Sequence, residues 1–408
     1  MQIEKLLENI AEGYLHLERH VNDGSPSGFS DNTTSKRTSP KKGDNSFKVS
    51  VIQFDNTIDV IEIGEDIGCG LPDNAVFCHP DNLLLPLFQD ISTHWREIGT
   101  VEVAPTSSGR TVKCLGENGF FIKLDYFGIL GRLHRNLDKK RLLSAIEVSN
   151  CFSDALDSKL IGQNFQIFRE RYGRIATLPF SDGKQYELGF VLREENPYPI
   201  KCNVAAYIPF FSLFSKDEIF PKDEPIITQL LKKQDKNATD FLSDIVIIPT
   251  INFYFDTLTK CGLCLEAHAQ NMFLGIDSNF QITSIIVRDM ESVDKDLPLR
   301  EFLNLDAKFK SDTYKCLRAT DYNYQIMHSF MFDFKFGSYL IDPLVEIFSH
   351  IDGFDKVKTI EKIRHTVKLR IKELPQDYFP KQWFNYGNQI FKQGEKRPYI
   401  TNDNPKYR

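Results

Sequence analysis

Three carboxylates, an amide and an imidazole stand close together in one part of the sequence. Glu266, His268 and Asn271 lie in one short stretch, and Asp289 and Glu291 follow shortly after it. Carboxylate and amide oxygens are hard ligands that suit Mg²⁺, and Mg²⁺ usually binds together with phosphates. Carboxylates gathered in one place also repel one another unless a cation lies among them. These residue types therefore indicate a metal–nucleotide site.

The segment between the two groups predicts the element that brings them together. Residues 272–276 and 281–287 are apolar runs rich in Ile, Val and Phe, and Asp277-Ser278-Asn279 between them has the composition of a turn. This pattern predicts a β-hairpin. The open end of the hairpin would bring both groups of polar side chains to the same place.

A second set of polar residues, earlier in the chain, supplies hydroxyls and cations. The loop 105–111 contains Ser108, Arg110 and Thr111. Hydroxyls, backbone N–H groups freed by a glycine and a guanidinium all suit phosphate, although such a loop also fits an ordinary polar turn. Lys123 lies in an apolar strand, where its ammonium needs a partner.

Composition and charge restrict the class of protein. The chain has 408 residues, of which 41% are hydrophobic and 26% charged, enough for two or three structural units. Its net charge of -6 argues against a general nucleic-acid binder. No apolar run of membrane-spanning length and no signal sequence is evident, so the eight cysteines are expected to be reduced thiols in a cytoplasmic protein. We expect no nucleic-acid and no membrane partner.

Sequence patterns divide the chain into four parts. Residues 1–20 have helical spacing of apolar residues, and residues 21–46 are too polar to bury a core and predict a disordered linker. Residues 47–215 are mostly strands, and residues 216–408 are mostly helices around the hairpin. Strands followed by helices, without alternating βαβ units, predict an α+β fold. The first helix is expected to be a frayed terminus, with a docking element as the alternative.

Several motifs resemble the NRPS-independent siderophore synthetases of the aerobactin-synthetase type. In chain order they are Phe-Cys-His-Pro at 77–80, Thr-Ser-Ser-Gly-Arg-Thr at 106–111, Lys123 with Arg135, Leu-Glu-Ala-His-Ala-Gln-Asn at 265–271, Arg288-Asp289, and Thr-Val-Lys-Leu-Arg-Ile at 366–371. Their order and spacing agree over roughly residues 75–375. The resemblance implies a hand-like fold that holds ATP between a mixed or antiparallel β subdomain, residues 47–215, and a helical, kinase-like palm, residues 216–408.

The resemblance also implies a role for each candidate residue. The side chains implied to hold ATP are Ser108, Arg110, Thr111, Lys123, Arg135 and Asn271. Those implied to bind or position Mg²⁺ are Glu266, Asn271, Asp289 and Glu291. Those implied to act in catalysis are Lys123, Arg135 and His268, the last two also contacting the substrate acid or the adenylate. Arg370 is a further candidate for the substrate carboxylate, since a guanidinium binds a carboxylate with two hydrogen bonds; its alternative is a helix-surface ion pair.

In this family a carboxylate of citrate or a related acid attacks the α-phosphorus of ATP, and an amine or hydroxyl nucleophile then displaces AMP. The implied partners are these small molecules with ATP and Mg²⁺, and the family often dimerises, which makes a homodimer one expectation. The chain is shorter than most members and lacks their N-terminal Gly-His-Pro-x-His-Pro element. Three functions stay open: a shortened ligase, a phosphotransferase acting on the γ-phosphoryl group, and a non-catalytic partner that binds nucleotide or, through its first helix, a full-length synthetase.

Overall fold

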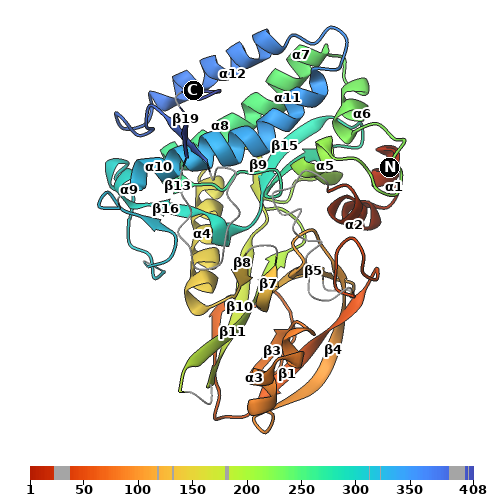
Figure 1. The fold of residues 1–408 in the computed structure, drawn as a ribbon, viewed down its shortest axis with the longest axis vertical. Coiled ribbons are helices and arrows are strands. Elements are labelled where there is room, and N and C mark those ends of the chain that lie inside the picture. The colour runs from red at the N-terminus through yellow and green to blue at the C-terminus, as the bar shows by residue number, and fades with distance from the viewer. Residues whose placement is uncertain are drawn as a thin grey trace.

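Strands gather in one part of the molecule and long helices in the other (Figure 1). The computed structural model describes residues 1–22, 37–116, 119–130, 133–179, 183–311, 313–321, 323–385, 400–402 and 404–408. The fold is α+β with antiparallel and mixed sheets, as predicted.

The large sheet has eight strands in the order β2-β10-β11-β6-β5-β4-β1-β3, and every neighbouring pair is antiparallel. Its strands are β1 (Phe47–Phe54), β2 (Asp59–Gly64), β3 (Ala75–Cys78), β4 (Trp95–Pro105), β5 (Thr111–Cys114), β6 (Phe120–Leu124), β10 (Glu170–Pro179) and β11 (Gln185–Glu194). The short segments beside it are η2 (Asn82–Leu84), α3 (Pro86–Asp90) and the antiparallel pair β7 (Tyr126–Leu130) and β8 (Leu133–Arg135).

Smaller sheets lie among the helices. The small sheet has the order β12-β14-β15-β9, with β12 (Ala206–Pro209), β14 (Met272–Ile276), β15 (Ile282–Val287) and β9 (Phe165–Ile167). The other strands are β13 (Leu263–Cys264), β16 (Asp294–Asp296), β17 (Cys316–Leu317), β18 (Trp383–Asn385) and β19 (Ile400–Asn402). The helical segments are α4 (Lys139–Asp157), α5 (Phe210–Phe214), α6 (Ile226–Lys232), α7 (Ala238–Asp240), η3 (Phe241–Ile247), α8 (Ile248–Cys261), η4 (Met290–Ser292), α9 (Leu297–Phe302), α10 (Tyr324–Ser329), η5 (Phe330–Ile341), α11 (Asp342–Phe348) and α12 (Lys356–Ile371).

Two hydrophobic cores organise these elements. One lies against the large sheet and comes from residues 47–192, and the other comes from residues 1–21 and 148–407. Helix α4 packs on the large sheet through Leu142 and Ile146 and reaches the second core through Phe152. The boundary between residues 215 and 216 stays a prediction, although β9 and β12, which precede it, pair with strands of the palm.

The segments α7, η3 and α8 form one continuous helix through the second core. Residues Ala238–Cys261 are long and apolar enough to cross a bilayer, contrary to the expectation of no such run, and they form the one such helix in the described part of the chain. However, 72% of its apolar window is buried inside the protein. Such burial is that of a core helix, because the apolar side chains face other parts of the same chain.

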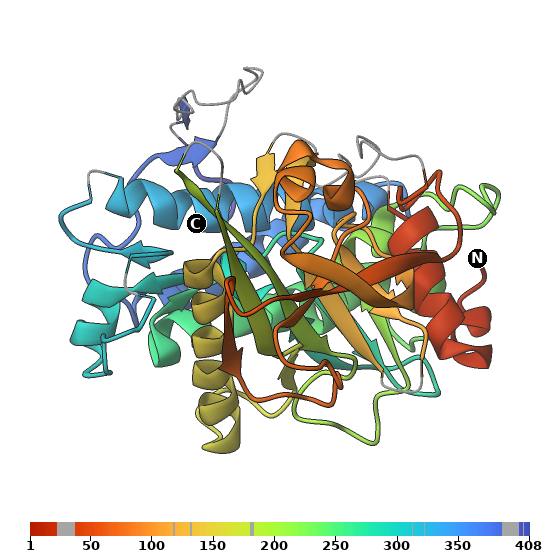
Figure 2. The same cartoon turned by 90° about the horizontal axis from the view of Figure 1, so that it is seen from below.

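The N-terminal residues form two packed helices, α1 (Glu4–Glu8) and α2 (Ile10–His20). They separate at Asn9, whose side chain caps α2 by accepting a hydrogen bond from the Glu12 N–H. Leu6 and Leu17 are fully buried in the second core. The prediction that the first helix is a frayed terminus is therefore wrong. Its apolar face, which the alternative prediction assigned to docking, is covered by other parts of this chain. In the view of Figure 2, α1 and α2 lie to the right of the strands and α4 lies to the left, where it packs against β2, β10 and β11.

The predicted linker 21–46 is described only in part. Residues 23–36 lie outside the described residues. After them, the Arg19 side chain of α2 donates hydrogen bonds to the carbonyl oxygens of Pro40, at 2.8 Å, and Asp44, at 3.2 Å, and to Asn45 Oδ1 at 2.8 Å. The linker is therefore shorter at this end than predicted.

Candidate active site

Two neighbouring strands of the large sheet position the cations. Thr111 of β5 pairs with Lys123 of β6, so Arg110, just before β5, lies beside the lysine. Gly109 has a positive φ of 73°, which allows the chain to turn into β5. Ser108 Oγ accepts a hydrogen bond from the Thr111 N–H at 2.9 Å, so this hydroxyl also stabilises the loop itself. The phosphate-binding and polar-turn interpretations of the loop are thus compatible.

The palm hairpin brings the two polar groups together, as predicted. Met272 of β14 pairs with Val287 of β15, and the Arg288 N–H donates to the Asn271 carbonyl oxygen at 2.9 Å. Asp289 follows with φ 70° and ψ 63°, a left-handed conformation that is uncommon outside glycine. Strained backbone of this kind is concentrated at functional sites.

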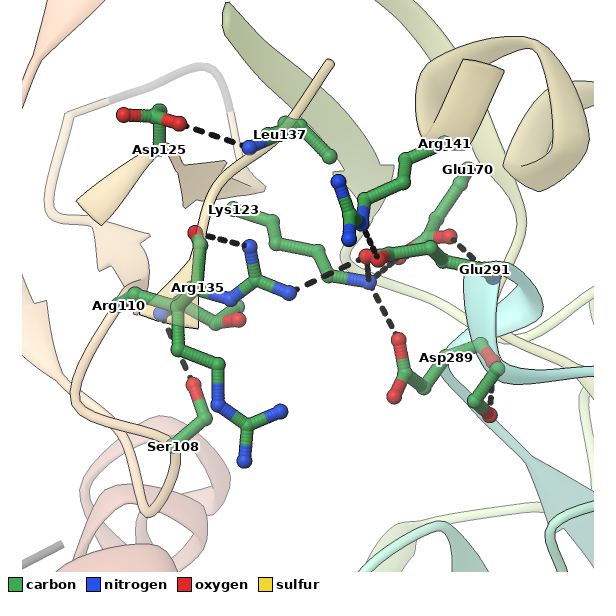
Figure 3. Close-up of polar contacts among 12 residues, drawn as sticks. Ser108, Arg110, Lys123, Asp125, Arg135, Leu137, Arg141, Glu170, Asp289 and Glu291 are labelled. Atoms are coloured by element: carbon green, nitrogen blue, oxygen red, sulfur yellow. Dashed lines mark hydrogen bonds and ion pairs between the residues drawn. The ribbon is translucent and has the colours of Figure 1, made fainter. Parts of the chain in front are cut away.

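An ion-pair cluster, which we call the Lys123 cluster, joins the large sheet to the palm (Figure 3). Lys123 Nζ lies 2.7 Å from Glu291 Oε2 and 3.3 Å from Glu170 Oε1, and it contacts an oxygen of Asp289. Arg110 Nη2 lies 3.1 Å from the same Glu291 oxygen. The Asp289 side chain is 33% exposed, whereas those of Lys123 and Glu170 are 5% and 1% exposed. The cluster is therefore open to solvent on the Asp289 side.

Burial and ion pairing act in opposite directions on the pKa values of the cluster. Burial lowers the pKa of Lys123, but the charges of Asp289, Glu170 and Glu291 outweigh it and raise that pKa. Burial raises the pKa values of Asp289 and Glu291, but Lys123 and Arg110 hold both below their ordinary values. For Glu170, burial prevails over Lys123 and its pKa is raised. Glu170 is thus the carboxylate that most readily takes up a proton if its cation is lost.

Both carboxylate oxygens and the backbone N–H of Glu291 have partners. Its Oε1 accepts a hydrogen bond from the Tyr314 hydroxyl at 3.2 Å and lies 3.5 Å from Arg141 Nε. Its backbone N–H donates to Glu170 Oε2 at 3.3 Å. Of the two carboxylates predicted to follow the hairpin, Asp289 is therefore the one that is available to a ligand.

Glu266 and His268 form the second half of the site, joined to the hairpin by Asn271. Asn271 Nδ2 donates to the Glu266 carbonyl oxygen at 3.1 Å, and Glu266 Oε1 lies 2.9 Å from Lys335 Nζ, in the π-helical segment η5, and 4.0 Å from His268 Nε2. Burial lowers the pKa of His268 to about 4, against the opposing charge of Glu266. His268 Nδ1 accepts a hydrogen bond from the Gln270 N–H at 3.2 Å. The ring is therefore neutral near pH 7 and carries its proton on Nε2.

Arg135 presents a free guanidinium at the end of β8. Its carbonyl oxygen accepts a hydrogen bond from Arg110 Nη1 at 2.8 Å, and the Asp125 carboxylate accepts one from the Leu137 N–H at 2.7 Å, which fixes the chain on both sides of the β7–β8 pair. The Arg135 guanidinium makes no hydrogen bond or ion pair with any residue of the described ranges, and it points away from the cluster (Figure 3). Burial lowers the pKa of the Arg135 guanidinium most, and the nearby positive charge of Arg110 lowers it further. This cation is left for an anionic ligand.

Arg370 forms ion pairs with carboxylates of α8 and of its own end of the chain. Helix α12 lies along the outer side of α8 (Figure 1), and Arg370 Nη2 lies 2.6 Å from Asp256 Oδ1 on α8 and 3.2 Å from Glu373 Oε2. The predicted contact with a substrate carboxylate stays a prediction, although the guanidinium is already paired here. The structure shows the alternative, an ion pair between helices.

Four more residues of the site come from four separate elements or loops: Glu170, Arg141, Tyr314 and Lys335. The position of Lys123 in an apolar strand predicted a partner, but no local pattern shows which carboxylate it is. Only Lys335 carries a signal of its own, as a lone cation in the aromatic run Phe-Met-Phe-Asp-Phe-Lys-Phe-Gly.

The oxygen donors fit a Mg²⁺ ion that is shared with a nucleotide. In the described ranges, no three His, Cys, Asp or Glu side chains form a group that could hold a metal by themselves. Mg²⁺ usually takes one or two carboxylates and fills its remaining positions with phosphate oxygens and water. Asp289 is partly exposed, and the amide oxygen of Asn271 accepts no hydrogen bond from a described residue. Of the four predicted metal ligands these two fit best. All three carboxylates pair with cations, but Asp289 is the most exposed of them, at 33% against 21% for Glu266 and 9% for Glu291.

Comparison with known proteins gives a clear result at the level of structure. No protein-family model and no curated protein sequence matches the chain. Solved structures do resemble it, among them the following three. The ATP-bound aerobactin synthetase IucA of a hypervirulent pathotype of Klebsiella pneumoniae aligns over 84% of this chain and 66% of its own, with 14% identity and a TM-score of 0.66. The petrobactin biosynthesis protein AsbB of Bacillus anthracis aligns over 89% and 68%, with 16% identity and a TM-score of 0.66.

The aerobactin synthetase IucC from the same Klebsiella pathotype aligns over 91% of this chain and 71% of its own, with 15% identity and a TM-score of 0.67. The chain thus spans about two thirds of the length of the first of these structures. It has the hand-like fold of the NRPS-independent siderophore synthetases.

Proposed function

We propose that the protein is an ATP-dependent ligase that activates a carboxylic acid as an acyl-adenylate for transfer to an amine or hydroxyl, as in siderophore assembly. The observation that carries this proposal is the convergence of Arg110 and Lys123 with Asn271 and Asp289 where the large sheet meets the palm, with the backbone of Arg135 hydrogen-bonded to Arg110 beside them. Its likeness in fold to an aerobactin synthetase with bound ATP supports the same conclusion.

The distribution of charge suits adenylation. A carboxylate that approaches the α-phosphorus of ATP brings two anions together, so the site must supply cations. Lys123 and Arg110 are paired with carboxylates of the protein, whereas the guanidinium of Arg135 is unpaired among the described residues. We assign Arg135 to the incoming anions, and Arg110 and Lys123 to the phosphates at the mouth of the cluster.

Asp289 and Asn271 would hold Mg²⁺, which when bound supplies positive charge to the triphosphate and the leaving pyrophosphate. We assign Glu291 to positioning the cations rather than the metal, because it already forms ion pairs with Lys123 and Arg110 and accepts a hydrogen bond from the Tyr314 hydroxyl.

His268 suits the role of a hydrogen-bond donor to the reacting carboxylate or the adenylate. With Nδ1 accepting the Gln270 N–H and a pKa of about 4, the neutral ring presents Nε2–H. A ring in this tautomer has no free nitrogen to accept a proton. The substrate-contact role is therefore favoured over that of general base for the amine.

A phosphotransferase is the second candidate, and a specific observation supports it. Lys123 pairs with Glu170, and Asn271 and Asp289 follow them in the chain, which is the order of the nucleotide and metal groups in protein kinases. Of the third alternative, docking to a full-length synthetase through the first helix has lost its basis because the apolar face of that helix is buried, whereas non-catalytic nucleotide binding stays open.

Product analysis separates the ligase from the phosphotransferase. The protein is incubated with ATP, Mg²⁺ and a panel of carboxylic acids, each with and without an amine, and the nucleotides are separated. A ligase forms AMP and pyrophosphate in an acid-dependent manner, and Arg135→Ala abolishes this. The formation of ADP without AMP would establish the phosphotransferase instead, and the absence of both products with every acid would refute the two candidates together.

A further inference from the structure

Glu18 of α2 is a fully buried carboxylate whose ligands come from both halves of the molecule. Its Oε2 accepts hydrogen bonds from the Ser107 N–H at 3.1 Å and from Ser107 Oγ at 2.6 Å. Its Oε1 accepts one from the Tyr14 hydroxyl at 3.0 Å and forms an ion pair with Arg288 Nη1. Both oxygens are therefore occupied, and every partner is a donor.

Two of the residues that bind Glu18, Ser107 and Arg288, are next to residues of the candidate nucleotide site. Ser107 belongs to the loop before β5 and precedes Ser108, while Arg288 follows the palm hairpin and precedes Asp289. Arg288 Nη2 also donates to Ser107 Oγ at 3.2 Å. One carboxylate thus ties the phosphate-binding loop of the large sheet to the palm segment that carries Asp289.

The charge of Glu18 is necessary for this arrangement. Burial raises its pKa, but Arg288 and Ser107 outweigh burial and hold the pKa below its ordinary value. A glutamine at this position would present an NH₂ group to Ser107 or to Arg288, and both already donate. An isosteric amide therefore loses one of the two connections while it keeps the shape of the side chain.

We propose that Glu18 is a positioning residue for nucleotide binding, which holds the loop 106–111 and the segment 288–291 at the separation that ATP requires. The inference rests on the proposed function, because it takes these two segments to be the two sides of the ATP site. The first helices are then part of the enzyme's nucleotide-binding apparatus and not an accessory to it.

The test measures ATP affinity by calorimetry, in the presence of Mg²⁺, for the wild type, Glu18→Gln, Ser107→Ala and the double variant, all at a temperature where each is folded. Glu12→Gln, at an exposed position of the same helix, is the matched control. We expect Glu18→Gln to weaken ATP binding about tenfold or more, equivalent to about 1.4 kcal/mol. Ser107→Ala weakens it less, and the double variant binds about as poorly as Glu18→Gln alone because the two residues act through one connection. The control stays within about twofold of the wild type.

Hydrogen exchange of the unliganded variants distinguishes local positioning from general destabilisation. We expect faster exchange in 106–111 and in 288–291 for Glu18→Gln, with the core of the large sheet unchanged. If folded Glu18→Gln binds ATP as tightly as the wild type and has only a lower melting temperature, the inference is overturned and the proposed function stays intact. If Glu18→Gln does not fold, wild-type affinity in Ser107→Ala overturns it equally. A wild-type protein that does not bind ATP refutes the proposed function first, and the inference with it.

Discussion

Replacing Lys123 by methionine removes the cation on which the Lys123 cluster depends. Methionine keeps much of the volume and the unbranched shape of the side chain, so the change is mainly one of charge. Glu170 is then left without the ammonium that lies 3.3 Å from it, and it is almost fully buried. Glu291 keeps Arg110 at 3.1 Å, and Asp289 is one-third exposed and can be hydrated.

The expected loss of stability follows from these three environments. Removing one partner of a buried ion pair costs about 3–5 kcal/mol, whereas an exposed pair contributes about 0–1 kcal/mol. The Glu170 pair accounts for most of the loss, and protonation of Glu170, whose pKa is already raised, limits it. We expect a decrease of about 3 kcal/mol in the free energy of unfolding at pH 7. Acid-dependent AMP formation should fall by about a hundredfold or more, because a cation at the phosphates is lost.

Urea denaturation and product analysis measure the two effects separately. The double variant Lys123→Met/Glu170→Gln removes the stranded charge as well, so it should recover about 1–2 kcal/mol of stability and none of the activity. Lys113→Met is the matched control, since this lysine lies on the neighbouring strand β5 and pairs with Glu195, which is 34% exposed. A Lys123→Met protein as stable and as active as the control would refute the account of the cluster.

Three further predictions concern Arg135, His268 and Arg370. Arg135→Ala should change the free energy of unfolding by less than about 0.5 kcal/mol, because the guanidinium has no partner among the described residues. A clear fall in the urea midpoint of this variant would contradict this prediction. The pKa of His268 is lowered from 6.5 to about 4, so between pH 6.5 and 4 the unfolded chain binds a proton that the folded protein excludes. The wild type should therefore lose up to about 3 kcal/mol more than His268→Gln as the pH falls through this window, which acid titration of urea midpoints measures; parallel curves would show that the ring is not held neutral. Arg370→Ala should lower the melting temperature through loss of the Asp256 ion pair and leave AMP formation unchanged, and a selective loss of activity would place Arg370 at the substrate site.

The local parts of the site could be predicted from the sequence. The palm hairpin is encoded in two apolar runs and the turn between them, so the meeting of Asn271 with Asp289 follows from short-range pattern alone. The α+β class likewise follows from strands that precede helices.

The contacts between distant segments could not be predicted in this way. Glu170 reaches Lys123 across β11 within the large sheet, and Tyr314 reaches Glu291 from a loop of the helical part; no periodicity specifies either contact. The polar linker and the short helices at the N-terminus gave no sign of Glu18, whose partners lie far along the chain. The ion pair of Arg370 with Asp256 could not be predicted in detail either, because a motif on a helix does not determine which neighbour its side chains contact.

The fate of carboxylate oxygen tests the central claim of adenylation most directly. An acid that supports AMP formation is labelled with ¹⁸O in its carboxylate, incubated with the protein, ATP, Mg²⁺ and an amine, and the phosphorus products are analysed by mass spectrometry. Attack of the carboxylate on the α-phosphorus leaves one labelled oxygen in each AMP when the amine displaces it. We predict this label in AMP; label in inorganic phosphate together with ADP, or AMP free of label, would contradict the account.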